Sequence, residues 1–289
     1  MENDRRQLNY FDCHLHTKSS HDSTEEHSAI IKHALEEGLA GYMVTDHVDI
    51  LRAEGEAFLS PAYDSFENYS RLVSSGYEGT LAEVKGNEAP LLEIRFGVEL
   101  GDSIRNKKAS AKLIADLPFD AVLGSVHKVY IDENDFVFSN YDFKELPKEL
   151  VRRVVVQYYT DVLKTAEESD IDVLSHLNII NRYEGKFCGG DIEDEVLGPI
   201  IRKILGVIID RGIALEINTS RIGRGMFMPG PEVVRAYKEM GGKLITLGSD
   251  AHAGFTAGIG FKEAGDMLKE AGFDHACFFR KRKPVLYTV

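Results

Sequence analysis

The sequence predicts an α/β protein whose strands form one parallel barrel. Three observations support this fold class. Short apolar, β-prone segments alternate with helix-like segments about seven times, no linker or change of composition divides the 289 residues, and polar side chains gather where the strands end. A doubly wound open sheet is the alternative. Neither a G-x-G-x-x-G after the first strand nor a P-loop motif occurs, so the usual signatures of a nucleotide-binding sheet are missing.

Seven segments have the apolar composition and short length of buried strands. They cover residues 8–14, 40–45, 91–98, 119–126, 173–175, 213–217 and 244–247. A last extended segment, basic in its middle, covers residues 276–287. Since parallel strands of a barrel all point to one face, the polar residues that follow them are expected to meet there.

Helix-like segments lie between these strands. They cover residues 23–38, 63–85, 106–116, 147–169, 192–211, 229–240 and 261–271, and residues 49–61 are predicted to form a loop. Ser23 and Thr24, before a run of acidic residues, predict the start of the first helix, and Gly38 predicts its end. Pro229 is expected at the start of another helix.

Composition narrows the range of partners. The 34 basic and 47 acidic residues give a net charge of −13, which repels nucleic-acid phosphate and anionic lipid. No apolar run approaches the roughly 20 residues of a membrane span, and the first nine residues lack the apolar core of a signal peptide. Cys13, Cys188 and Cys277 are too scattered for a disulfide framework. We expect a cytoplasmic protein with free thiols that binds neither nucleic acid nor membranes.

The histidines indicate where the chemistry lies. Six of the ten stand at or just past a predicted strand end, and acidic residues stand beside them. The candidate metal ligands at these ends are His14, His16, His47, Glu99, His127, His176, Asp250 and His252. His14 and His16 are two residues apart on a strand and therefore share a face. Asp12 lies on the same face and is a candidate to orient one of these ligands.

Imidazole and carboxylate ligands without thiolate suit zinc, manganese or iron. The ligands are too many for one ion, so we expect two or three ions that share Glu99 as a bridge. A lone histidine is more often a surface or hydrogen-bonded residue than a ligand. We interpret four histidines in that way: His21, His27, His33 and His275.

Taken in order, these motifs resemble those of the PHP (polymerase and histidinol phosphatase) superfamily of metallophosphoesterases. The matching motifs are DCHLH at 12–16, TDH at 45–47, GVE at 97–99, GSVH at 124–127, SH at 175–176 and SDAH at 249–252. The resemblance runs from residue 11 to about residue 260. It implies a distorted (β/α)7 TIM-like barrel, a single domain over residues 1–289, and a site with three metal ions.

The resemblance also implies how the ligands are shared. One ion would be held by His14, His16, Glu99 and Asp250, a second by Glu99, His127 and His176, and a third by Asp22, His47 and His252. Aspartate at position 22 is common in the histidinol-phosphatase branch, and the alignment excludes the neighbouring His21. The phosphate-binding arginines of the family match Arg182 and Arg221 best, with Arg224 as a weaker match.

The resemblance implies a metal-dependent phosphomonoesterase acting on a small phosphorylated metabolite. The branch points to L-histidinol phosphate and histidine biosynthesis, with metal-bound hydroxide attacking phosphorus. Arg182 and Arg221 would bind the phosphate, and Asp250 or His252 would protonate the leaving group. The first alternative is a PHP phosphoesterase for nucleotides or another small phosphate ester.

Two further alternatives belong to other classes of protein. A regulatory protein on a degenerate barrel should have lost ligands, whereas all nine positions are filled. An amidohydrolase also uses His-x-His on its first strand, but it usually needs a metal-bridging lysine, and Glu99 stands where this site needs its bridge.

Overall fold

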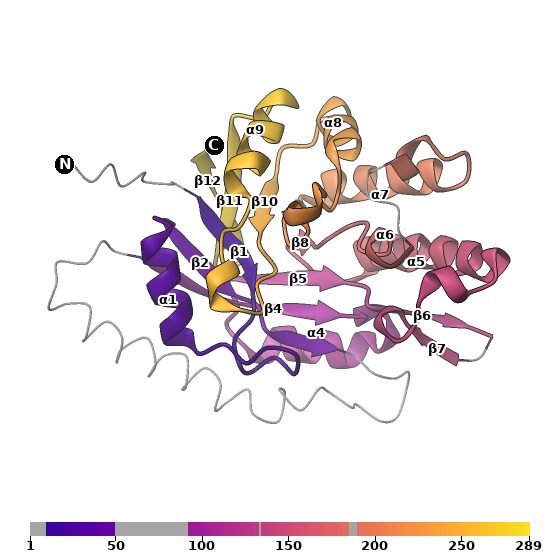
Figure 1. Cartoon of the computed structure of the whole chain (residues 1–289), viewed down its shortest axis with the longest axis horizontal. Helices are drawn as coiled ribbons and strands as arrows, with labels where there is room; N and C mark the ends of the chain where they lie inside the picture. Colours follow the sequence, from indigo (N-terminus) through magenta and orange to yellow (C-terminus); the bar gives the residue numbers. More distant parts are fainter. Residues whose placement is uncertain (1–9, 50–91, 133, 185–189) are drawn as a thin grey trace, which may run out of the picture.

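Seven parallel strands form a nearly closed barrel, as the alternating pattern predicts (Figure 1). The structure is a computed structural model that describes residues 10–49, 92–132, 134–184 and 190–289. The strands pair in the order β1 (Phe11–Leu15), β2 (Gly41–Val44), β4 (Glu93–Gly101), β5 (Ala121–Ser125), β8 (Val173–Leu174), β9 (Ala214–Asn218) and β10 (Ile245–Gly248). The barrel closes between its first and last strands, where the Asp250 amide donates to the His14 carbonyl at 2.8 Å.

Helices surround the strands on the outside of the barrel (Figure 1). They are α1 (His27–Glu36), α4 (Lys107–Asp116), α5 (Lys148–Glu168), α6 (Asn181–Glu184), α7 (Leu197–Arg211), α8 (Pro231–Glu239) and α9 (Phe261–Glu270). Each long helix buries an apolar stripe; α5, for example, buries Val154, Tyr158 and Val162. This packing between helices and strands forms the main hydrophobic core. None of the helices in the described ranges is long and apolar enough to cross a membrane.

Three of the predicted helix starts are wrong, whereas those near residues 106, 147 and 261 agree with the structure to within one residue. The first helix begins at His27, not at Ser23. Instead of capping a helix, the Ser23 hydroxyl donates to the His252 carbonyl at 3.1 Å and so holds the loop after β1 against the loop after β10. The helix predicted from residue 192 begins at Leu197, and the one predicted from residue 229 begins at Pro231. The helix predicted over residues 63–85 lies outside the described residues.

Several small elements have no counterpart in the predicted pattern. β3 (His47–Asp49) pairs with β4, and β6 (Lys128–Ile131) forms an antiparallel hairpin with β7 (Asn134–Val137). Short 3₁₀ helices are η2 (Ser103–Arg105), η3 (Phe138–Asn140), η4 (Phe143–Glu145), η5 (Gly190–Glu193), η6 (Ile222–Arg224) and η7 (Gly254–Thr256). Most of them lie in the connections that follow a strand, which is where a barrel builds its site.

The last extended segment is a hairpin of β11 (His275–Arg280) and β12 (Lys283–Thr288). Phe278 stacks on Phe11 with 4.2 Å between ring centroids, in a second apolar cluster with residues at the strand starts. The hairpin therefore covers the end of the barrel opposite the polar strand ends. Cys13 and Cys277 are buried in this cluster as free thiols, as predicted, whereas Cys188 lies outside the described residues.

Candidate metal centre

The structure brings all nine predicted ligands together at the C-terminal ends of the strands. They line or adjoin one cavity of about 670 Å³. His14, His47 and Glu99 lie within strands, and the others follow directly after β1, β5, β8 and β10 or, for Asp22, in the loop after β1. Residues more than 200 positions apart meet here because parallel strands all end on one face.

Glu99 lies at the centre of this group and is fully buried. Its Oε2 is 3.1 Å from His14 Nε2 and 2.9 Å from His47 Nδ1. Its Oε1 is 3.0 Å from His127 Nε2 and 2.8 Å from His176 Nε2. One carboxylate thus faces imidazoles from four different strand ends, which is the position that a bridging ligand requires.

Asp250 lies beside the His14–His16 pair. Its Oδ1 is 3.2 Å from His16 Nε2 and 3.7 Å from His14 Nε2. Asp250 has a left-handed backbone with φ of 52°, which is rare for a residue other than glycine and often marks functional sites. The group His14, His16, Glu99 and Asp250 is therefore compact enough to share an ion.

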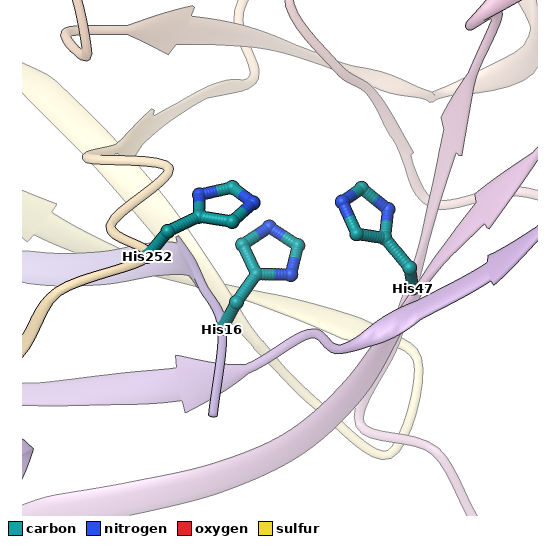
Figure 2. A group of neighbouring side chains, drawn as sticks. All are labelled: His16, His47 and His252. Atoms are coloured by element: carbon teal, nitrogen blue, oxygen red, sulfur yellow. The ribbon is translucent and has the colours of Figure 1, made fainter. Parts of the chain in front are cut away.

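Asp22 completes a third group on the outer side of the centre. Its Oδ2 is 3.0 Å from His252 Nε2 and 3.5 Å from His47 Nε2. Figure 2 shows the rings of His16, His47 and His252 turned toward one another. The His16 ring lies between the other two, with centroids 4.3 Å from His47 and 4.2 Å from His252.

Among the described residues, four candidate ligand atoms of this centre are buried, lie close to one another or to Asp250, and yet have no hydrogen-bond partner of suitable geometry: His14 Nε2, His16 Nε2, His47 Nδ1 and Glu99 Oε2. An unpaired buried polar atom costs about 1–3 kcal/mol, so a cluster of them points to a shared ligand. Within the described ranges, the centre contains four overlapping groups of three histidine or acidic side chains whose ligand atoms lie within 4.8 Å of one another. Nitrogen and oxygen donors at this spacing fit divalent metal ions.

The electrostatics of the centre are those of a charged cluster held away from water. Burial raises the pKa of Glu99, but His47, His14 and His127 outweigh it and leave the pKa well below its usual range. Burial lowers the pKa of His16 to about 3, and neighbouring His47 adds to this effect. The Glu99 carboxylate is thus ionised and the His16 imidazole neutral, which are the forms that bind metal. Burial lowers the pKa of His47, but the charge of Glu99 outweighs it and raises the pKa to about 10, so a metal ion would compete with a proton at this ring.

The far nitrogens of several ligand rings have partners of their own. His16 Nδ1 is 3.0 Å from the Ser20 hydroxyl, His127 Nδ1 is 3.0 Å from Asp49 Oδ1, and His14 Nδ1 is 2.6 Å from Glu216 Oε1. Such contacts fix which ring nitrogen faces a metal. The pattern of strand ends did not predict a role for Asp49 or Glu216. For Glu216, the sequence does contain one indication, which is a glutamate in the middle of the apolar strand β9.

Asp12 contacts the candidate ligand His14 through its backbone and not through its imidazole. Its Oδ1 accepts the backbone amides of His14 at 3.2 Å and Ser249 at 3.0 Å, and its Oδ2 accepts the Gly258 amide at 2.9 Å. Burial raises the pKa of Asp12 to about 6. Asp12 therefore holds the backbones of β1 and the segment after β10 together, and it contacts no ligand imidazole.

The two predicted phosphate-binding arginines, Arg182 and Arg221, line the same cavity as the ligands, whereas Arg224 lines a neighbouring hollow with Arg182. Burial, followed by the like charges of Arg182 and Arg224, lowers the pKa of Arg221. The Arg221 Nε is buried and has no hydrogen-bond partner within the described residues. A guanidinium that lies near like charges and has an unpaired N–H favours binding of an anion in the cavity.

The four histidines predicted to lie outside the metal centre occupy different environments. His27 Nε2 is hydrogen-bonded to the Tyr42 hydroxyl at 2.6 Å, His33 is half-buried on α1, and His275 is exposed. His21, although exposed, lines the cavity with its ring centroid 5.3 Å from that of His47. Phe138 and Ile179 add apolar surface to the cavity wall.

A barrel with this cluster at its strand ends has the architecture of a metal-dependent hydrolase. Residues 12–220 match the PHP domain family, so the chain belongs to that family, as its motifs predict. Asp250 and His252 lie beyond the matched range, and β10 places them in the same centre.

Relatives over nearly the whole chain carry one name. The chain is 28% identical over 276 residues to a probable histidinol-phosphatase of Clostridium acetobutylicum, covering 94% of this chain and 97% of the relative. It is also 28% identical over 280 residues to the histidinol-phosphatase of Lactococcus lactis, covering 94% and 95%.

Solved structures agree with these sequence relatives. The crystal structure of histidinol phosphate phosphatase from L. lactis, in complex with zinc, L-histidinol and phosphate, matches with a TM-score of 0.72 and 26% identity. The match covers 96% of this chain and 99% of the other. A putative histidinol phosphatase from Listeria monocytogenes matches with a TM-score of 0.70 at 16% identity, covering 88% and 99%, and supports the fold.

Proposed function

We propose that this chain is a metal-dependent phosphomonoesterase that hydrolyses L-histidinol phosphate to L-histidinol and phosphate, a reaction of histidine biosynthesis. One observation carries the proposal: a cluster of buried candidate ligand atoms, which have no hydrogen-bond partner among the described residues, lies at the cavity that Arg182 and Arg221 line. A site with cations on both sides suits a phosphate ester better than a neutral amide. The names of the relatives support the choice of substrate.

The proposed cofactors are two to three divalent transition-metal ions: zinc, manganese or iron. We assign His14, His16, Glu99 and Asp250 to one ion, Glu99, His127 and His176 to a second, and Asp22, His47 and His252 to a third. The distances within each group support this division. Zinc in the complex of the L. lactis protein supports the class of metal.

Bound divalent ions would lower the pKa of water to supply a nucleophile and would offset negative charge on the phosphate. The protein's own residues bind the phosphate, protonate the leaving group and exclude water. Arg182 and Arg221 donate paired N–H groups to phosphate oxygens and hold the ester in line for attack. Asp250 and His252, the two predicted proton donors, both line the cavity, and His252 is the one suited to deliver a proton to the departing alkoxide oxygen. Burial lowers the pKa of His252, but Asp22 outweighs this effect and raises it, whereas His14 and His16 outweigh burial at Asp250 and leave its carboxyl ionised. Phe138 and Ile179 exclude water from the organic part of the substrate.

A second candidate substrate is a nucleotide or another small phosphate ester. The cavity of about 670 Å³ is large enough for such a molecule, and the chemistry would be the same. The net charge of −13 opposes a long nucleic acid. A cytoplasmic location is also part of the proposal, and the free buried thiols of Cys13 and Cys277 support it. The extent of the single domain, residues 1–289, stays a prediction.

The experiment is a phosphate-release screen over L-histidinol phosphate, sugar phosphates and mononucleotides, with protein supplied with Zn²⁺ or Mn²⁺. We expect the highest kcat/KM for L-histidinol phosphate. Arg221→Ala is the matched control, because it should lose turnover while keeping its metal. A preference for mononucleotides would replace the proposed substrate by the second candidate. No phosphate release from any ester, with metal bound, would overturn the proposed activity.

A further inference from the structure

Glu216 is a buried carboxylate that the proposed reaction does not yet use. It lies in the middle of β9 between the apolar residues Leu215 and Ile217, and its exposure is 0%. A charge in such a place is costly unless it is paired and hydrogen-bonded. The position of Glu216 therefore requires a specific partner for each oxygen.

Both oxygens of Glu216 contact residues of the proposed metal centre. Oε1 is 2.6 Å from His14 Nδ1, and Oε2 accepts the backbone N–H of His176 at 2.6 Å. The Asn218 side-chain amide is 3.4 Å from Oε2. Glu216 thus connects two ligands that come from different strands, β1 and the end of β8, and whose Nε2 atoms lie near opposite oxygens of Glu99.

We propose that Glu216 is a positioning residue that holds His14 and His176 in the form and orientation in which their Nε2 atoms bind metal. The inference rests on the metal centre of the proposed function. When His14 binds a metal through Nε2, its ring is neutral and its proton lies on Nδ1, where Glu216 Oε1, at 2.6 Å, is placed to accept it. The lone pair then lies on Nε2, which points at Glu99.

The contact with His176 acts on the backbone. His176 has φ of 23°, a strained conformation for a residue with a side chain. The hydrogen bond from its amide to Glu216 Oε2 stabilises that conformation, which directs the ring toward Glu99 Oε1 at 2.8 Å. His176 Nδ1 is buried and has no partner within the described residues, so the backbone contact is the constraint that Glu216 supplies.

The neighbouring strand leaves room for this arrangement. A Cβ at Gly248 in β10 would lie 2.2 Å from Glu216 Oε1 and 2.6 Å from His14 Cβ. Any side chain there would displace the carboxylate or the imidazole. The absence of a side chain at Gly248 is therefore required by the Glu216–His14 pair.

Glutamine at position 216 is the sharpest substitution, because it keeps the shape and removes one acceptor. A carboxylate offers an acceptor to both N–H groups, whereas an amide offers one acceptor and places an NH₂ group against the other N–H. Glu216→Gln therefore either loses the hydrogen bond from the His176 amide or places an N–H donor against His14 Nδ1, which favours the His14 tautomer that cannot bind metal through Nε2. We expect apparent affinity for Zn²⁺ to fall about 10- to 100-fold, the usual effect of removing a partner of a ligand histidine.

The measurement is Zn²⁺ affinity by competition with a chromophoric chelator, with circular dichroism as the check of folding. Asp161→Asn is the matched control: Asp161 is also a buried carboxylate, paired with Arg105 Nη2 at 3.0 Å, but it lies on α5 outside the centre. Its Zn²⁺ affinity should equal that of the wild type. Equal affinity in a folded Glu216→Gln would overturn the inference.

A second measurement needs no variant of Glu216. In Zn²⁺-loaded wild-type protein, ¹⁵N NMR of histidine side chains should show the His14 proton on Nδ1, with the signal assigned by its loss in His14→Gln. A proton on Nε2 would overturn the inference even if Glu216→Gln failed to fold. Failure of the proposed function looks different: the wild type itself would then bind no Zn²⁺ or release no phosphate.

Discussion

Replacing Arg221 with alanine should separate catalysis from stability. Arg221 lines the cavity, its Nε has no hydrogen-bond partner among the described residues, and two other arginines lie near enough to lower its pKa. Without substrate, the Arg221 guanidinium is repelled by Arg182 and Arg224, and its Nε gains no hydrogen bond from the described residues that would offset this repulsion. A phosphate ester supplies the missing negative charge, so the arginine contributes when substrate is bound.

The magnitude follows from the type of contact. A paired, charge-assisted donor to transition-state oxygens contributes about 2–4 kcal/mol, so kcat/KM should fall about 30- to 1,000-fold. The lost packing of the side-chain stem is offset by relief of repulsion, so we expect the free energy of unfolding to change by less than about 1 kcal/mol. Inorganic phosphate should inhibit the variant more weakly, and the metal content should stay the same.

The assay is steady-state phosphate release, run beside chemical denaturation and elemental analysis on the same preparation. Arg182→Ala should behave similarly, and Arg224→Ala should lose less because Arg224 lines the neighbouring hollow. Unchanged kinetics in both Arg182→Ala and Arg221→Ala would refute the reasoning and would move the phosphate site toward Arg224.

Three further outcomes are expected. Glu99→Gln should abolish turnover in a folded protein, since its amide has no charge to balance two dications; near-normal rates would exclude Glu99 as the bridge. The acid limb of the pH–rate profile should move to lower pH as free metal is raised, because protons compete for the imidazoles; a fixed limb would exclude that competition. Burial lowers the pKa of His27 from 6.5 in the unfolded chain to about 4 in the folded protein. As the pH is lowered from 6.5 to 4, the unfolded state therefore binds the proton before the folded state does, and the free energy of unfolding decreases. In chelator-treated protein, this decrease should be about 2–3 kcal/mol smaller in His27→Gln than in the wild type, measured by denaturation at pH 6.5 and at pH 4. An equal decrease in the variant and the wild type would contradict this prediction.

The barrel and the convergence of eight candidate ligands were predictable from the sequence because both depend on local pattern, whereas Asp22 was indicated only by the family resemblance. His14 and His16 are two apart on a strand, and His47, His127 and His176 each follow a short apolar run. Once the strands are parallel, their ends must converge, so position along each strand is enough to bring these side chains together. An error of one or two residues in a predicted strand boundary does not change the conclusion that these side chains converge.

Contacts that depend on packing between distant strands were not predictable. Glu216 contacts His14 across 202 positions of sequence, and nothing local to either residue indicates that pairing. Ser23 has the local pattern of a helix cap but donates to the His252 carbonyl, so tertiary contact overrides local preference. The β6–β7 hairpin was missed because its four-residue strands are too short for a clear alternating pattern.

The most direct test of a metal-dependent phosphatase site is to titrate metal-free protein with Zn²⁺ or Mn²⁺. Phosphate release from L-histidinol phosphate and bound ions per chain are measured on the same samples. We predict that activity is absent without metal and rises until two to three ions are bound per chain. Full activity in protein that elemental analysis shows to hold no zinc, manganese or iron would contradict the assignment of the nine ligands.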